Sequence, residues 1–216
     1  LNDVFDVWFD SGNVANVFSN ENGLNHTPNM VLEGKDQYRG WFQSLLWMSL
    51  VLHDKPAFKN LVCHGFVLDQ DKMKFAKSKG NAPNLNTYKE KYGVDTLRLW
   101  VAHHNLGEDV AFSTLKLDNM KSFYQRFRLT LRFLESNLFD FFNHYDENFK
   151  VEDDFNLHAL HEFNQMHKKV SALYSQYDFK KSVDLLFKFC DEFLSGFYFP
   201  YSKNVCYLSS LDSTKR

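Results

Sequence analysis

Hydrophobic and polar positions follow two different rhythms along the chain. Up to about residue 112, short apolar runs of strand length alternate with segments whose apolar residues recur at helical spacing. We expect strands over residues 3–9, 29–34 and 58–69, and helices over residues 37–53 and 86–104, the second helix broken at Gly93. This alternation predicts an α/β layer with parallel strands.

From about Leu115 the pattern is helical throughout. One apolar stripe covers residues 117–142, and after a polar break at 143–154 a second helical pattern covers 158–203. The second pattern predicts two or more helices until Pro200. The fold class is therefore expected to be α/β followed by all-α, with a helix bundle or part of one in the second half.

Composition narrows the class of protein. Of the 216 residues 44% are hydrophobic, which is enough for a real core, and the formal net charge is −2. Any contact with nucleic acid has to come from local basic patches. The chain begins on Leu1 and stops without a capping or tail pattern, so we expect a piece of something longer.

The cysteines and the apolar runs indicate the compartment. Cys63, Cys190 and Cys206 lie far apart without a C-x-x-C pair, which fits a reducing cytosol and predicts no zinc or other metal site in the segment. The apolar runs are too short to span a bilayer, and Leu1 does not begin a signal peptide. A cytoplasmic location without membrane contact is expected.

Polar side chains cluster where the strand at 29–34 ends. Ligands bind at the carboxyl ends of strands in an open α/β sheet, and Gly34 lets a ligand approach the backbone closely. Glu33, Asp36 and Gln37 would then offer acceptors and an amide to ribose hydroxyls or an ammonium group. The alternative, in which Asp36 only caps the helix and Glu33 is solvated, stays open.

Two tryptophans and one histidine lie on or next to the predicted loop ends. Trp8 and Trp41 could wall a pocket for an apolar ligand, or could be ordinary core residues. His64 lies within a strand-like run, where a lone histidine is more often a hydrogen-bonded core residue than a catalyst.

A basic loop, "DKMKFAKSKGN", follows the strand at 58–69. Lys74, Lys77, Ser78 and Lys79 give it ammonium groups on flexible stems, which suit phosphate contact. Phosphoryl and nucleotidyl transfers need cations where charge develops on the leaving phosphates. Read alone, the loop fits a solvated basic segment equally well.

Five ordered segments carry a resemblance to a known family. "DVFDVWFDSG", "LEGKDQYRGWFQSLL", "HGFVLD", "KFAKSKGN" and "KYGVDTLRLWVA" resemble class I aminoacyl-tRNA synthetases, specifically the isoleucyl enzymes of the bacterial type. The resemblance implies the second half of a Rossmann-like catalytic domain over residues 1–114. It also implies part of an anticodon-binding helical bundle over residues 115–216, where "FLSGFYFPYSKNVCYLSSLDSTKR" is similar to a further stretch of the family.

The resemblance also implies roles for individual residues. Lys74, Lys77 and Ser78 fall in the family's Lys-Met-Ser-Lys-Ser loop, which holds ATP phosphates and stabilises the leaving pyrophosphate, with Lys77 closest to ATP. Contact with the isoleucyl-adenylate is implied for four neighbouring residues, Glu33, Gly34, Asp36 and Gln37. His64 would lie on the adenine side, and the walls of the isoleucine pocket would be Trp8 and Trp41.

The implied ligands are ATP with Mg²⁺, isoleucine and tRNA(Ile), with the whole enzyme a monomer. Two loop positions depart from the family: Phe75 replaces the usual Met, and Ala76 replaces the usual Ser, which puts one hydrogen bond in doubt. No His-Ile-Gly-His-like motif occurs in the 216 residues, so the segment alone should hold half an active site.

Three alternatives remain at this point. The chain could come from the valine-specific relative, although "DVWFDSG" and "EGKDQYRGWFQ" favour isoleucine. It could be a non-catalytic tRNA-binding module that uses Arg126, Arg128 and Arg132, or those arginines could form a solvated helix face. It could also be an inert remnant of a longer gene.

Overall fold

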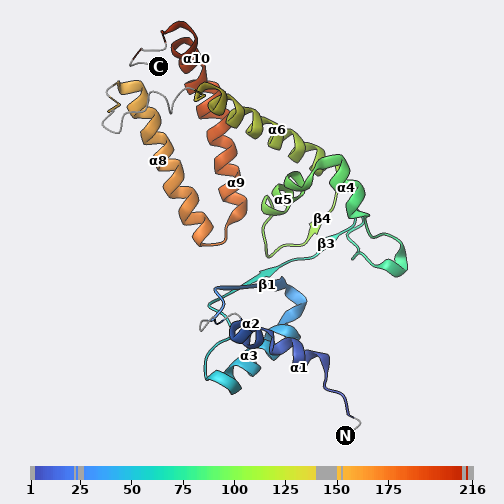
Figure 1. Cartoon of the computed structure of the whole chain (residues 1–216). Coiled ribbons are helices and arrows are strands. Elements are labelled where there is room, and N and C mark those ends of the chain that lie inside the picture. The colour runs from blue at the N-terminus through green and yellow to red at the C-terminus, as the bar shows by residue number, and fades with distance from the viewer. Residues whose placement is uncertain are drawn as a thin grey trace. The chain divides into compact units, whose positions relative to one another are not determined.

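The computed structural model describes residues 3–21, 23, 27–139, 150–151, 153–210 and 213. Their backbone contacts divide the chain into two compact units (Figure 1). Unit 1 consists of Leu1–Ala82 and Leu106–Phe112, and unit 2 consists of Pro83–Asn105 and Ser113–Arg216. The sequence boundary at residues 114 and 115 concerns the domains of the family and stays a prediction.

Unit 1 is a small α/β layer. Its elements are α1 (Val7–Gly12), α2 (Val14–Glu21), β1 (Met30–Gly34), the 3-10 helix η1 (Lys35–Arg39), α3 (Trp41–His53), β2 (Asn60–His64), β3 (Val67–Leu68), the 3-10 turn η2 (Lys77–Lys79) and β4 (Val110–Ala111). β1 pairs with β2, β3 pairs with β4, and both pairs are parallel. The prediction of parallel strands in an α/β half is confirmed.

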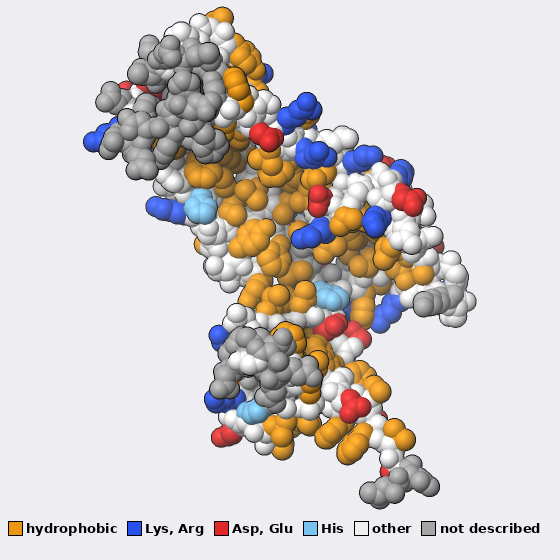
Figure 2. All heavy atoms as spheres, in the orientation of Figure 1, with side chains coloured by type: hydrophobic (Ala, Val, Ile, Leu, Met, Phe, Trp, Pro, Cys, Tyr) orange, Lys and Arg blue, Asp and Glu red, His pale blue; other side chains and the backbone are white. Residues whose placement is uncertain are grey.

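The core of unit 1 lies between β1 and α3. Four side chains are buried there, from Val31, Phe42, Leu45 and Ala57, and the ring of Trp41 packs partly against them. Helix α3 is hydrophobic on nearly every side: Leu45 is 1% exposed, yet Trp47 is 63% and Val51 is 79% exposed. Hydrophobic side chains are accordingly visible on the surface of unit 1 (Figure 2).

Two strand predictions in this unit need correction. Residues 3–9 do not form a strand, because Asp6 caps a helix: its carboxylate Oδ1 accepts a hydrogen bond from the Trp8 backbone N–H at 2.7 Å. Residues 58–69 form two strands with a break at Gly65. A Cβ atom on Gly65 would collide with the backbone of Glu108, so the break is where segment 106–112 lies against the chain.

Unit 2 is helical. Its elements are α4 (Leu85–Tyr92), α5 (Val94–Ala102), α6 (Thr114–Asn137), α8 (Asp154–Ser175), α9 (Phe179–Lys188), the π-helix η3 (Phe189–Tyr198) and α10 (Phe199–Leu208). The break at Gly93 is confirmed, and so is the expected all-α second half. The predicted helix at 117–142 is observed to Asn137; positions 140–149, which include its end and most of the polar break, lie outside the described residues.

The sequence predicted that the helices end at Pro200, and this prediction is wrong. Pro200 lies in the first turn of α10, where a missing backbone N–H is tolerated, and the helix continues to Leu208. The π-helical turns of η3 precede it, and these bury Cys190, whose pKa is raised to about 11 by burial. None of the helices that the structure describes is long and apolar enough to cross a membrane.

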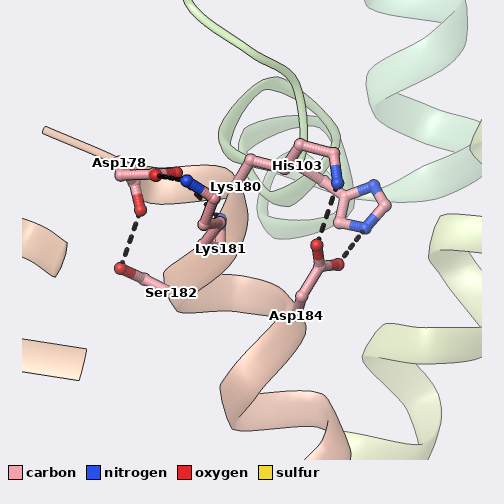
Figure 3. A network of polar contacts seen from close by, with 6 residues as sticks. All are labelled: His103, Asp178, Lys180, Lys181, Ser182 and Asp184. Atoms are coloured by element: carbon pink, nitrogen blue, oxygen red, sulfur yellow. Dashed lines mark hydrogen bonds and ion pairs between the residues drawn. The ribbon is translucent and has the colours of Figure 1, made fainter. Parts of the chain in front are cut away.

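A polar network joins α5 to α9 in unit 2 (Figure 3). His103, at the end of α5, contacts the Asp184 carboxylate through Nε2 at 2.7 Å, and Lys180 contacts the same carboxylate at 2.9 Å. Burial opposes ionisation of Asp184, but Lys180 and His103 outweigh it and hold the pKa of Asp184 below its ordinary value. Asp178 caps α9 by accepting from the Lys181 backbone N–H. The contact between His103 and Asp184 therefore links the end of α5 to the second turn of α9.

The core of unit 1 makes a prediction about stability. Leu45→Ala should lower the free energy of unfolding by about 2–5 kcal/mol, because the cavity left in the core cannot close fully. The same truncation at the half-exposed Leu52, two turns farther along α3, should cost less than about 1 kcal/mol. Urea unfolding followed by tryptophan fluorescence measures both. Equal losses in the two variants would place the core elsewhere.

Candidate active site

A pocket opens beside α1, β1 and α3 in unit 1. Its volume is about 340 Å³, and it is lined by Val7, Trp8, Ser11, Glu33, Gln37 and Trp41. Four of these residues, Trp8, Glu33, Gln37 and Trp41, were candidates from the sequence. Val7 and Ser11 were not, because the strand expected at residues 3–9 hid the helical spacing that places Ser11 next to both Val7 and Trp8. The pocket combines indole surfaces with one carboxylate and one amide.

Hydrogen bonds fix the two sides of this pocket to each other. The indole Nε1 of Trp41 donates to the Ser11 carbonyl at 2.9 Å, which ties α3 to the end of α1. The Trp41 backbone N–H donates to the Gln37 side-chain oxygen at 3.1 Å, so the Gln37 amide satisfies the first turn of α3. The ring of Trp41 therefore lines the pocket and also packs against the core, while its contact with an apolar ligand stays a prediction.

Gly34, Asp36 and His64 gather next to the pocket, at the carboxyl ends of β1 and β2. Gly34 is paired in register with His64, and a Cβ at Gly34 would lie 2.7 Å from Asp36 Oδ1 and 3.6 Å from His64 Cε1. Asp36 does not cap a helix; its Oδ2 accepts a hydrogen bond from the Gln37 amide at 3.1 Å. A side chain at position 34 would therefore displace the Asp36 carboxylate from this arrangement.

The orientation of His64 follows from one hydrogen bond. Its Nδ1 lies 2.8 Å from the Gly65 carbonyl oxygen, and since a carbonyl only accepts, Nδ1 carries the hydrogen. In the neutral ring Nε2 is then an acceptor. This ring is half-buried, so it can offer an acceptor to a donor such as an exocyclic amine.

The basic loop is fixed at its base by Asn81. The Asn81 side chain accepts from the Ala76 backbone N–H at 2.9 Å and donates to Asp69 Oδ2 at 2.8 Å and to the Lys74 carbonyl at 3.3 Å. Lys74 and Ser78 are exposed. Lys77 begins η2, and its side chain lies outside what the structure describes. The loop contributes none of the described residues that line the pocket.

Asp69 closes the other side of this base. Its Oδ1 accepts from the backbone N–H groups of Asp71 at 3.0 Å and Met73 at 2.8 Å. The Met73 hydrogen bond, followed by that from Asn81, holds the pKa of the Asp69 carboxyl below its ordinary value. The charged carboxylate therefore stabilises the turn from which the lysines extend.

Comparison with known families decides where the chain belongs. The family model for class I tRNA synthetases (I, L, M and V) matches residues 1–113, and the model for the anticodon-binding domain of tRNA ligases matches residues 156–215. The chain belongs to the class I tRNA synthetases. The resemblance carried by the five sequence segments is thereby confirmed.

Curated relatives of this class I synthetase segment bear one specific name. The isoleucine–tRNA ligase of Streptococcus mutans is 38% identical over 218 residues, covering 100% of this chain and 23% of the relative. That of Mycoplasmopsis agalactiae is 36% identical, covering 99% of this chain and 24% of the relative. The chain thus spans about a quarter of the length of the curated relatives that it matches.

Solved structures support the fold of the synthetase segment. A LeuRS–tRNA–LeuAMS ternary complex from Agrobacterium radiobacter K84 superposes with a TM-score of 0.73 at 16% identity, over 90% of this chain and 27% of that one. Methionyl-tRNA synthetase of Mycobacterium tuberculosis, bound by methionyl-adenylate, superposes with a TM-score of 0.60 at 17% identity, over 87% of this chain and 36% of that one. The expected fold, half of a Rossmann-like class I domain followed by helices, is confirmed.

The described residues of the segment contain no group of three or more His, Cys, Asp and Glu side chains placed to hold a metal ion.

The arginines singled out on α6 differ in their surroundings. Arg126 pairs with Asp191 at 2.8 Å, while the Arg128 guanidinium lies 5.7 Å from the centre of the Tyr124 ring. Arg126 thus already has an acidic partner within the protein.

The base of the loop makes a prediction about pH. The pKa of Asp69 is lower in the folded chain than in the unfolded chain, where it is about 3.9. The Asp69 carboxylate therefore stabilises the turn fully at pH values above about 3.9, and this stabilisation is lost as the pH falls through the lower folded pKa. The amide proton shift of Met73, which donates to Asp69 Oδ1, should titrate with a midpoint below that of ordinary aspartate. NMR between pH 6 and pH 2 measures this. In Asp69→Asn the titration should vanish, and its persistence there would assign it to another group.

Proposed function

We propose that this segment is part of an isoleucine–tRNA ligase and contributes half of the site that activates isoleucine with ATP. One observation carries the proposal: the candidate residues Trp8, Trp41, Glu33 and Gln37 surround one pocket in a chain whose curated relatives are isoleucine–tRNA ligases. The pocket is apolar where the tryptophans lie and polar where β1 ends. That combination suits an amino acid with an aliphatic side chain.

In the proposed reaction the carboxylate of isoleucine attacks the α-phosphate of ATP, and pyrophosphate leaves. The aminoacyl group then passes to a hydroxyl of the terminal ribose of tRNA(Ile). No covalent bond to the protein forms, so the side chains act through position and charge. Trp8 and Trp41 hold the isoleucine side chain, and Glu33, Gly34, Asp36 and Gln37 contact the aminoacyl-adenylate.

The nucleotide would lie along the remaining candidates. His64 can accept from the adenine amine through Nε2. The loop residues Lys74, Lys77 and Ser78 hold the phosphates, with Lys77 nearest to the leaving pyrophosphate. Mg²⁺ would arrive on the ATP phosphates rather than in a carboxylate cage, since it is commonly bound through substrate phosphates. The replacement of Ser by Ala76 removes a hydroxyl, but the Ala76 backbone N–H is held by Asn81.

The rest of the protein is required for this activity. Exposed apolar side chains on α1 and α3 of unit 1, such as Val7, Trp47 and Val51, suit burial against further catalytic-domain structure. We therefore expect the isolated 216 residues to be inactive in activation. Residues 1–114 would be the second half of the catalytic domain and 115–216 part of the anticodon-binding bundle, in a cytoplasmic, monomeric enzyme.

A chimera tests the proposal. The 216 residues replace the matching segment of the Streptococcus mutans ligase, and isoleucine-dependent exchange between ATP and pyrophosphate is measured. The chimera should catalyse exchange. Lys77→Ala should lower kcat by about 10²–10³-fold, the usual cost of removing one group that stabilises developing charge.

The control is Lys55→Ala, an exposed lysine of unit 1 far from the loop in sequence, which should leave the rate unchanged. Full exchange by the Lys77→Ala chimera would end the assigned role of the loop. Exchange driven by valine in preference to isoleucine would favour the valine-specific relative.

A second candidate, tRNA binding without activation, is favoured by the match of residues 156–215 to the anticodon-binding family. It predicts that the 216-residue chain alone binds tRNA with an affinity that falls as salt rises. Arg128→Ala should weaken that binding, whereas Arg126, paired with Asp191, should contribute less. Binding that does not depend on salt would exclude phosphate contacts as its source.

A further inference from the structure

The ammonium group of Lys74 lies on an aromatic ring. Its Nζ is 3.7 Å from the centre of the Phe66 ring, and the Nζ of Lys35 is 5.2 Å from the same centre. Contacts within about 6 Å attract a cation to the ring face. Lys74 is the first lysine of the basic loop, and its side chain is otherwise exposed. The ring therefore selects one position for a side chain that could take many.

Phe66 is itself held firmly. Its backbone N–H donates to Asp109 Oδ1 at 2.8 Å, and its carbonyl accepts from the Val110 N–H at 2.8 Å. On either side, Gly65 donates to the Leu106 carbonyl at 2.7 Å, and Phe112 donates to the Leu68 carbonyl at 2.8 Å. Segment 106–112 thus runs along the whole of 65–68. A ring on such a backbone is a fixed platform rather than a loop side chain that follows the lysine.

Asp109 ties the charges around this platform together. Its Oδ1 pairs with the Lys35 ammonium at 2.6 Å, and that hydrogen bond, followed by the one from the Phe66 N–H, holds the pKa of Asp109 below its ordinary value. The charge of Lys74 acts in the same direction. Two ammonium groups therefore approach one ring, and the carboxylate beside it is bonded to only one of them. Lys74 is held by the ring face and by a more distant charge.

We infer that Phe66 is a positioning residue: its ring is the resting dock for the Lys74 ammonium, which leaves it when a polyphosphate binds the loop. The dock stands on the contacts above, and the release by polyphosphate rests on the proposed function of the loop. An exposed contact of this kind shifts an equilibrium by about two- to fivefold. It orients the lysine without locking it, since a bound phosphate offers a stronger, charge-assisted partner.

Trypsin provides the test on the 216-residue chain, because the loop contains its own cleavage sites. Cleavage after Lys77 reports how often the loop opens when opening is fast relative to cutting. Phe66→Leu should speed this cleavage about two- to fivefold. In a Lys74→Met background, Phe66→Leu should have no effect, because the cation that the ring holds is gone.

Lys79→Met is the matched control on the same loop, since the charge of Lys79 acts on Asp69 rather than on the ring. In that background the two- to fivefold effect of Phe66→Leu should persist. Cleavage after Lys59, which directly precedes β2 and donates to Asn29 Oδ1 at 3.0 Å, should be equal in all variants, which shows that unit 1 stays folded. If Phe66→Leu accelerates cleavage equally with Met at position 74, the ring acts through packing alone and the dock is wrong.

Repeating the series with inorganic pyrophosphate separates the dock from the proposed function. Pyrophosphate should slow cleavage after Lys77 and abolish the difference between Phe66 and Phe66→Leu, because Lys74 is then on the anion. Protection with the difference undiminished would overturn release from the dock. If pyrophosphate protects no variant while the Lys74 dependence holds without it, phosphate binding by the chain fails and the dock itself stands.

Discussion

The parallel pairing of β1 with β2 is the constraint on which the candidate site depends. Because the strands run in the same direction and Gly34 lies opposite His64, both strands end at the same edge. The next residues of the chain, η1 with Asp36 and Gln37, then turn across that edge and start α3. An antiparallel pair would bring the start of one strand to the end of the other and separate these groups. The polar half of the pocket is thus a consequence of strand direction.

The apolar half of the pocket depends on whether residues 3–9 form a strand or a helix, and the alternation of apolar and polar residues does not decide between them. Residues 3–9 alternate as a strand does, but the Asp6 carboxylate meets the Trp8 N–H and begins a helix. In a strand, residues three apart point to opposite faces, whereas on a helix Trp8 and Ser11 share one face. The helix is therefore what aligns Trp8 with Ser11, whose carbonyl receives the Trp41 indole N–H. The helix cap formed by Asp6 therefore outweighs the alternation of apolar and polar residues, and the helix that results lines the pocket.

Sequence patterns predicted the features that depend on neighbouring residues. Features that depend on contacts between distant residues, or on backbone without a regular period, were missed. The helices of unit 2 followed from apolar spacing, and the loop lysines stood out by composition. Asn81 did not, because its partners Asp69, Lys74 and Ala76 are spread over irregular backbone that has no period. The π-helical turns at Phe189–Tyr198 were equally hidden, since their apolar residues still fit helical spacing. The break at Gly65 required knowing that segment 106–112 returns to lie beside it.

In the basic loop, strong hydrogen bonds stabilise the base, and a weaker contact with an aromatic ring orients the Lys74 ammonium. At its base, Asp69 and Asn81 satisfy backbone N–H groups, and losing these bonds would leave the turn without its internal partners. Farther out, the Lys74 ammonium contacts the face of the Phe66 ring, beside a carboxylate, Asp109, that is already bonded to Lys35. A strong ion pair there would compete with any phosphate for the same ammonium, while a bare surface would leave it unoriented. An aromatic platform lies between these limits, so the lysine is directed and still available.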